Sequence, residues 1–206
     1  MDYGHGGRDA GYSAGSVKEK DLNLKIGQKV RNLLLKHDIE VCTTRDDDDF
    51  VPLDVRTSRV RDCKDAALLV SIHTNASSSK NVQGIETFYN HHTLFYNELS
   101  MGNDDIKDSS INFDKNINHQ SKQLAELIHK NVLLNTAKIN KKIIDRGIKN
   151  KAIQLLFGVE VPAVLIECGF LSHPVEGLLL ADDKYQEKIA QGITKAIENF
   201  FDGQFA

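Results

Sequence analysis

Apolar residues recur along this chain at spacings of three and four, a period typical of helices with one buried face. Leu22, Ile26 and Val30 follow this spacing among Lys, Asn and Gln, so we predict an amphipathic helix from Glu19 to about His37. Further helices are predicted from the same pattern at 55–63, 124–132 and 185–197. Helices of this kind must bury their apolar faces against another layer.

Short apolar runs predict the strands of that layer, which lie at 40–44, 66–72, 84–89 and 162–167. The run at 66–72 is continuous, as expected for a strand covered on both faces. Strands that alternate with helices predict an α/β fold, with a central, mostly parallel, twisted sheet flanked by helices on both faces. The 206 residues fit one domain. A polar stretch at about 91–118 is predicted to be an insertion loop.

Composition excludes several classes of protein. With 40% hydrophobic and 27% charged residues the chain is globular. Its apolar runs are about five to seven residues long, against roughly 20 for a membrane span, so no membrane span is expected. The net charge of −3 and the lack of a basic stripe argue against nucleic acid as a partner. The acidic cluster at 46–49 is expected to be a solvated loop.

The three cysteines, Cys42, Cys63 and Cys168, are an odd number without Cys-x-x-Cys spacing. We therefore predict that each is a small buried apolar side chain, and that a disulfide scaffold is absent.

Candidate metal ligands stand near the predicted strand ends, where α/β sheets bind ligands. His5 lies in a Gly-His-Gly-Gly turn, His73 ends the buried strand and Glu19 opens the first long helix. Two imidazoles and one carboxylate form a catalytic type of zinc set, with the fourth position left to water. Taken singly, each residue also has a structural interpretation, because strand-end histidines are often hydrogen-bonded and glutamates favour helix starts.

Glu167 ends the apolar strand at 162–167. Burial there should raise its pKa and suit it to proton transfer. A salt-bridged structural role is the alternative, and sequence spacing does not prove that the four side chains converge.

Six motifs occur together in order along the chain: Asp-Tyr-Gly-His-Gly-Gly-Arg-Asp at 2–9, Lys-Glu-Lys-Asp at 18–21, Thr-Arg at 44–45, Ser-Ile-His-Thr-Asn-Ala at 71–76, Gly-Ile-Glu-Thr at 84–87 and Ile-Glu-Cys-Gly-Phe-Leu-Ser at 166–172. With these motifs, and with Asp-Arg-Gly-Ile-Lys at 145–149, the chain resembles the zinc-dependent N-acetylmuramoyl-L-alanine amidases, the amidase type 3 family of bacterial cell-wall hydrolases.

The resemblance implies an enzyme that cleaves the amide between the lactyl group of N-acetylmuramic acid and L-alanine in peptidoglycan. It implies that His5, Glu19 and His73 hold Zn2+ and that Glu167 is the catalytic glutamate. The stem peptide and the glycan strand would be its partners, and the cell wall or periplasm its location.

Two further residues are predicted to bind substrate. Asn75 would steady the substrate carbonyl or merely cap the turn, because Asn favours both. Arg146, which the resemblance places near the groove, would pair with a peptide carboxylate or simply carry surface charge. The other histidines match no ligand position in the family: His91, His92, His119, His129 and His173. We expect His129 to be exposed on the polar face of its helix.

The chain also departs from the family. A full apolar strand usually precedes the Gly-His-Gly-Gly turn, whereas only three residues do here, so we expect that the natural protein extends upstream and that an export signal lies there. Some relatives insert a self-blocking helix in the region of 91–118, which a regulatory partner would remove.

The alternative functions are a catalytically silent wall-binding or regulatory module and a different zinc amide hydrolase. The sequence does not indicate the oligomeric state.

Overall fold

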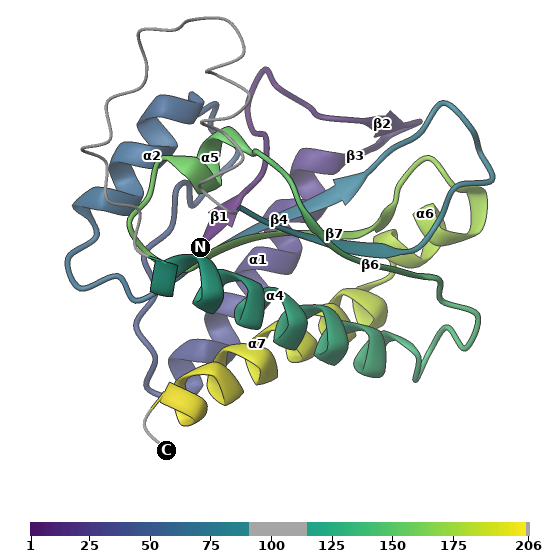
Figure 1. Ribbon diagram of the computed structural model, residues 1–206. Coiled ribbons are helices and arrows are strands. Elements are labelled where there is room, and N and C mark those ends of the chain that lie inside the picture. Colours follow the sequence, from purple (N-terminus) through teal and green to yellow (C-terminus); the bar gives the residue numbers. More distant parts are fainter. Residues whose placement is uncertain (91–114, 205–206) are drawn as a thin grey trace, which may run out of the picture.

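A five-stranded sheet forms the centre of the computed structural model, which describes residues 1–90 and 115–204 (Figure 1). The strands lie in the order β1 (Asp2–Tyr3), β4 (Leu69–Asn75), β7 (Ala163–Phe170), β5 (Ile85–Tyr89) and β6 (Asp145–Asn150). The pairs β1–β4, β4–β7 and β5–β6 are parallel, and only β5–β7 is antiparallel. The prediction of a mostly parallel α/β sheet is confirmed. A short hairpin precedes the first helix and consists of two antiparallel strands of two residues each, β2 (Ser13–Ala14) and β3 (Val17–Lys18).

Helices cover both faces of the sheet, as predicted. One face carries α1 (Glu19–Lys36), α4 (Lys115–Thr136) and α7 (Asp183–Gln204), which pack on one another below the sheet in Figure 1. The other face carries α2 (Leu53–Asp62) and the short α5 (Gln154–Phe157), while α6 (Pro174–Ala181) follows β7. Among the described residues, no helix is long and apolar enough to cross a membrane. Most of the predicted insertion at 91–118 lies outside the described residues.

Alternation along the strands decides which side chains face which layer. Val70 and Ile166 belong to the larger apolar core, which includes residues of α1, α4 and α7, whereas Leu69 and Leu165 belong to the smaller core with residues of α5. Because successive strand residues point to opposite faces, His73 lies on the face of α2 and α5. At its carboxyl end, the sheet therefore presents polar side chains on that face.

The strand predicted at 40–44 is wrong. The structure describes no strand there, because β1 is only two residues long and pairs with Ser71 and Ile72 on its other side. This segment contacts the first residue instead: the Thr44 N–H donates to the Met1 carbonyl at 3.0 Å, and the Met1 ammonium donates to the Cys42 carbonyl at 2.7 Å.

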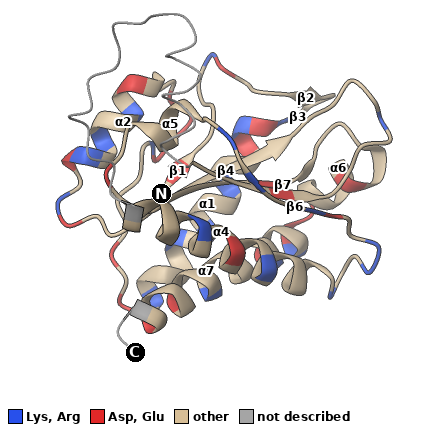
Figure 2. Ribbon diagram, viewed as in Figure 1, with Lys and Arg blue, Asp and Glu red and all other residues tan. Residues whose placement is uncertain are grey.

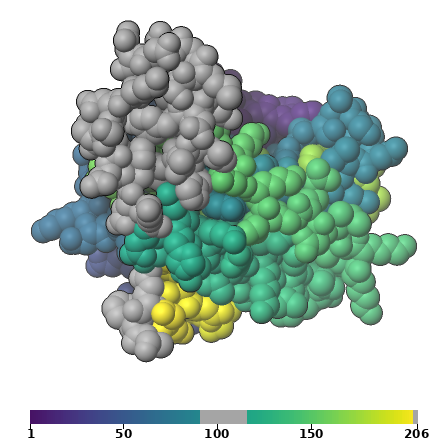
Figure 3. Space-filling model, viewed as in Figure 1, coloured from purple at the N-terminus to yellow at the C-terminus, as the bar shows by residue number. Residues whose placement is uncertain are grey.

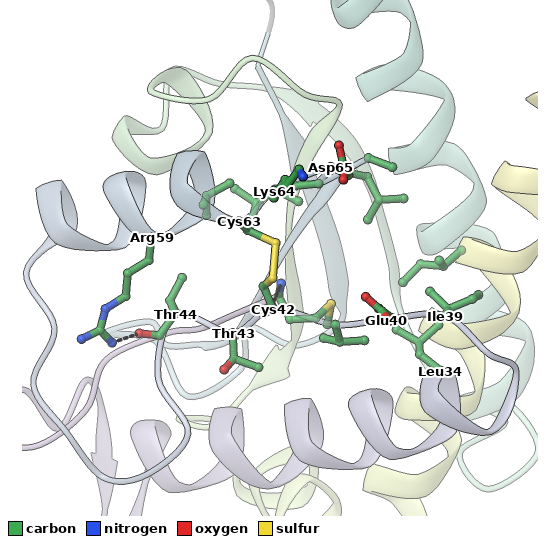
Figure 4. Close-up of a pocket in the computed structure, with 18 of the residues that line it drawn as sticks. Leu34, Ile39, Glu40, Cys42, Thr43, Thr44, Arg59, Cys63, Lys64 and Asp65 are labelled. Atoms are coloured by element: carbon green, nitrogen blue, oxygen red, sulfur yellow. Dashed lines mark hydrogen bonds between the residues drawn. A yellow bond between two sulfur atoms is a disulfide. The ribbon is translucent and has the colours of Figure 1, made fainter.

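The cysteine prediction is wrong for two of the three residues. Cys42 and Cys63 form a disulfide, and Cys42 is exposed, whereas Cys168 is free and buried as expected. The pairing depends on the packing of α2, from which Arg59 donates to the Thr44 carbonyl at 2.5 Å (Figure 4). A cavity of about 320 Å³ adjoins the disulfide, and the described residues that line it include none of the predicted site residues.

Candidate active site

The turn after β1 presents His5 through an unusual backbone conformation. His5 and Gly7 have φ values of 61° and 55°, in the left-handed region, and Gly6 has a φ of 139°. Gly4 lies against the ring of His73, because a Cβ atom added at Gly4 would lie 2.2 Å from Cε1 of that ring. The Gly-His-Gly-Gly sequence thus turns the chain and lets two imidazoles approach each other.

The structure brings the three candidate metal ligands, His5, Glu19 and His73, close together. Nε2 of His5 and Nδ1 of His73 each lie 3.1 Å from Oε1 of Glu19. One ligand atom from each residue lies within 4.8 Å of the other two, and these three residues are the one such group found in the described part of the chain. The residues come from the turn after β1, the first position of α1 and the strand β4. Segments far apart in sequence therefore build one site.

Outer contacts hold two of these side chains in place. Nδ1 of His5 lies 2.8 Å from Oδ2 of Asp9, which leaves Nε2 directed at Glu19. The Tyr12 N–H donates to Oε2 of Glu19 at 3.0 Å. A carboxylate behind a metal-ligating imidazole fixes its orientation and raises its basicity. The sequence reasoning did not assign Asp9, although it lies within the motif that contains His5.

The charges of the cluster fit a divalent cation. Burial lowers the pKa of His5, but the hydrogen bonds and charges of Glu19 and Asp9 outweigh this and raise the pKa to about 9. Burial would raise the pKa of Glu19, yet hydrogen bonds from His5 and His73 hold it well below its usual range. The carboxylates of Glu19 and Asp9 thus stabilise positive charge at this site, as they would stabilise a bound cation. Two imidazole nitrogens and a carboxylate oxygen are a donor set that suits zinc.

Glu167 lies beside this cluster as the register partner of His73 on β7. Its Oε2 is buried and has no hydrogen-bond partner among the described residues, and none of the ion pairs there includes it. Burial is the largest cause that raises the pKa of Glu167 to about 7, and the charges of Glu19 and Glu86 raise it further. The described part of the structure therefore contains no salt bridge of Glu167, the alternative role considered from the sequence.

Asn75 and Arg146 meet at a residue that sequence reasoning left without a role. The amide of Asn75 donates to Oε1 of Glu86 at 2.7 Å and accepts from the Ala76 N–H at 2.7 Å. Arg146 donates from Nε to Oε2 of Glu86 at 2.9 Å, and its guanidinium lies 5.0 Å from the centre of the Phe170 ring. Glu86 lies in the Gly-Ile-Glu-Thr motif at 84–87, which sequence reasoning quoted without giving this residue a role.

Two of the histidines that were not expected to be ligands have structural partners. His129 is buried, so its predicted exposure is wrong: Nδ1 lies 3.1 Å from the Thr87 hydroxyl and Nε2 lies 2.8 Å from Oδ1 of Asp145. His173 caps α6 by accepting from the Glu176 N–H at 3.1 Å. His91 and His92 lie outside the described residues.

Two buried arginines hold the backbone at and before the His5 turn through hydrogen bonds. Arg56 donates to the carbonyls of Tyr3 at 2.8 Å and His5 at 2.6 Å, and also to Asp2 at 2.8 Å. Arg45 donates to the Tyr3 carbonyl at 2.8 Å. Sequence reasoning quoted Arg45 within a motif but gave it no role.

A cavity of about 550 Å³ opens beside the cluster. His5 and His73 border it on one side, and its apolar wall includes Phe50, Leu53 and Leu155. Two of the three candidate metal ligands therefore face a space large enough for part of a substrate.

The fold and the site together define an α/β domain with a candidate metal centre beside a carboxylate that has no ion-pair partner among the described residues. Residues 1–199 match the family model described as N-acetylmuramoyl-L-alanine amidase. The chain belongs to this family of cell-wall hydrolases.

Relatives and solved structures agree with this assignment. The germination-specific N-acetylmuramoyl-L-alanine amidase of Bacillus subtilis is 31% identical, over 98% of this chain and 78% of its own length. The catalytic domain of the amidase CwlV from Bacillus (Paenibacillus) polymyxa superimposes with a TM-score of 0.79 at 31% identity, over 98% of this chain and 96% of that one. The CwlD amidase of Clostridioides difficile, in complex with the GerS lipoprotein, has a TM-score of 0.74 at 30% identity, over 98% and 96%.

Proposed function

We propose that this chain hydrolyses the amide between the lactyl group of N-acetylmuramic acid and L-alanine, with Zn2+ held by His5, Glu19 and His73. The observation that carries the proposal is the convergence of those three side chains to within 4.8 Å, next to Glu167, whose Oε2 has no hydrogen-bond partner in the described part of the chain. Gly4 and Gly11 support it, because a Cβ at Gly11 would lie 2.6 Å from Oε2 of Glu19. Both positions thus keep the cluster compact.

Zinc, when bound, would supply a Lewis acid that polarises the scissile carbonyl and makes water a better nucleophile at neutral pH. Glu167 takes the proton from the attacking water and passes it to the leaving nitrogen of L-alanine. A group with a pKa of about 7 suits both transfers, because it accepts and returns a proton at similar cost near neutral pH. Asp9 keeps the His5 ring oriented throughout.

Substrate contacts are proposed on either side of this centre. The apolar cavity beside His5 and His73 receives one side of the scissile bond. Arg146 uses Nε toward Glu86, and its terminal N–H groups pair with a carboxylate of the stem peptide. Asn75 supports the substrate carbonyl while its amide stays anchored on Glu86.

Peptidoglycan, as stem peptide and glycan strand, is the proposed partner, and the cell wall or periplasm the proposed location. A regulatory partner is also proposed. The structure of a related amidase in complex with a lipoprotein supports it. Self-blocking by the segment at 91–118 stays a prediction, because most of that segment lies outside the described residues.

The test is digestion of purified peptidoglycan by the zinc-loaded protein, with identification of new amino termini. Newly freed L-alanine amino termini are the expected result. Release of a different amine would favour the alternative zinc amide hydrolase. Binding to the wall without release of any product, by protein that carries one zinc per chain, would favour the catalytically silent module.

A further inference from the structure

Glu86 extends the row of polar side chains that crosses the sheet. Glu167 pairs in register with His73 on one side and with Glu86 on the other. Register partners on neighbouring strands point to the same face. Glu86 therefore lies on the same face as the candidate metal centre, one strand beyond Glu167, and its side chain is almost fully buried.

Two cations share this one buried carboxylate. Arg146 donates to Oε2 of Glu86 at 2.9 Å, and the ammonium of Lys149 donates to the same oxygen. Burial would raise the pKa of Glu86, but the hydrogen bonds from Lys149 and Arg146 outweigh it and lower the pKa, so Glu86 is ionised. One negative charge against two positive charges leaves an excess of one positive charge in this group of three side chains.

That excess charge is open to a ligand. The Arg146 and Lys149 side chains are 31% and 39% exposed, whereas Glu86 is only 6% exposed. The hydrogen bond that the structure describes for Arg146 uses Nε. Its terminal N–H groups have no acceptor among the described residues and can therefore donate to a ligand. Basic positions follow one another along β6 and the segment after it (Figure 2), and this part of the chain lies at the surface beside α4 (Figure 3).

The distance from the candidate metal centre limits the ligand. Neighbouring strands lie about 4.8 Å apart, so Glu86 lies roughly 10 Å across the sheet from His73. An extended peptide advances about 3.3 Å per residue, and the Arg146 and Lys149 side chains reach back toward the centre. A carboxylate on the second residue of the stem peptide, with L-alanine as the first, therefore matches the span.

We propose that Lys149 and Arg146 form a carboxylate-binding subsite for the second stem residue, and that Glu86 is the positioning residue that holds both cations. This inference rests on the proposed function. The carboxylate neutralises the excess positive charge and accepts charge-assisted hydrogen bonds from both side chains.

The test compares two synthetic muramyl tripeptides in which the second residue is a glutamate joined to the third through its side-chain carboxyl. Its α-carboxyl is a free carboxylate in one tripeptide and a carboxamide in the other. Zinc-loaded wild-type protein should show a kcat/KM about tenfold or more higher for the carboxylate, since hydrogen bonds to charged groups are worth about 1.5–3 kcal/mol. Lys149→Met and Arg146→Met should each lower this preference toward one. Lys149→Arg should retain most of it.

Lys151→Met is the matched control. Its ammonium lies 5.3 Å from the centre of the Phe88 ring, much as that of Lys149 lies at 5.7 Å, but only Lys149 has a described contact with Glu86. Lys151→Met should therefore leave the preference unchanged. Glu86→Gln should lower it, mainly through a higher KM for the carboxylate form, because both cations lose their anchor.

The outcomes separate this inference from the proposed function. Hydrolysis of both tripeptides with equal kcat/KM overturns the carboxylate subsite and leaves the amidase activity standing. An unchanged or higher preference in Glu86→Gln overturns the positioning role. If neither tripeptide is cleaved while intact peptidoglycan is, the two are compared as inhibitors of peptidoglycan hydrolysis, and equal inhibition overturns the inference. If no substrate is cleaved, the proposed function itself fails.

Discussion

Glu167 is the register partner of His73 on the neighbouring strand, and its Oε2 atom is buried without a hydrogen-bond partner in the described part of the chain. This pair joins a candidate metal ligand to a carboxylate that no ion pair among the described residues uses. Sheet geometry alone brings them together, because parallel strands align the two residues in one row.

Replacement of Glu167 by Gln should abolish hydrolysis while zinc stays bound. The amide keeps the size of the side chain but does not accept a proton, so we expect a loss of kcat of about hundredfold or more. Release of amino termini from peptidoglycan measures the rate, and metal analysis of the same sample is the control. Nearly wild-type turnover in this variant would remove Glu167 from the mechanism.

Asp9 should strengthen zinc binding although it is not a ligand. Its Oδ2 lies 2.8 Å from Nδ1 of His5, and loss of such a contact typically weakens metal affinity about 10- to 100-fold. Competition with a chelator measures the affinity of Asp9→Asn. Asp47→Asn is the matched control, because Asp47 is an exposed acid in the solvated cluster at 46–49. Equal affinity in the two variants would contradict the role of Asp9.

Asp2 should stabilise the fold in a pH-dependent way. Burial would raise its pKa, but Arg56, His73, Ser71 and Thr44 outweigh this and lower it below its usual value of 3.8. The folded state thus prefers the carboxylate, so the contribution is complete at neutral pH and is lost as the pH falls from about 4 through the lowered pKa.

The measurement is urea unfolding of the wild type and Asp2→Asn at pH 7, 5 and 3.5. At pH 7 the variant should be about 3 kcal/mol less stable, because Arg56 is left buried without its anion. The difference should persist at pH 5 and shrink at pH 3.5. A difference that grows on acidification would show that the sign is wrong.

The disulfide between Cys42 and Cys63 should stabilise the fold without serving catalysis. It closes a loop of 21 residues, for which chain entropy predicts about 3 kcal/mol. Reduction should lower the Tm of the wild type but leave that of Cys42→Ser unchanged. Activity per folded molecule should stay constant at low temperature, because none of the predicted site residues lines the cavity beside the disulfide. Loss of activity on reduction, without unfolding, would contradict this separation.

Sequence reasoning found the parts of the site that follow local rules. His5 and His73 were identifiable because a glycine turn and the end of an apolar strand place ligands at the carboxyl edge of an α/β sheet. Periodicity identified α1, because Leu22, Ile26 and Val30 recur at helical spacing and all belong to the core. These features need only the chain near each residue.

The remaining parts depend on contacts that local sequence does not encode. Glu86 meets Arg146 only because β5 lies between β7 and β6, an order that strand patterns do not fix. The disulfide depends on how α2 packs beside the segment at 40–44. That segment reads as a strand by composition, yet the two-residue β1 offers it too short an edge to form a ladder.

The most direct test of the candidate metal centre is anomalous diffraction at the zinc edge from crystals of the zinc-loaded protein. We predict one strong peak per chain, about 2.0–2.2 Å from Nε2 of His5, Nδ1 of His73 and a carboxylate oxygen of Glu19. The absence of a peak among these three side chains in fully active crystals, or a peak bound by other residues, would contradict the account.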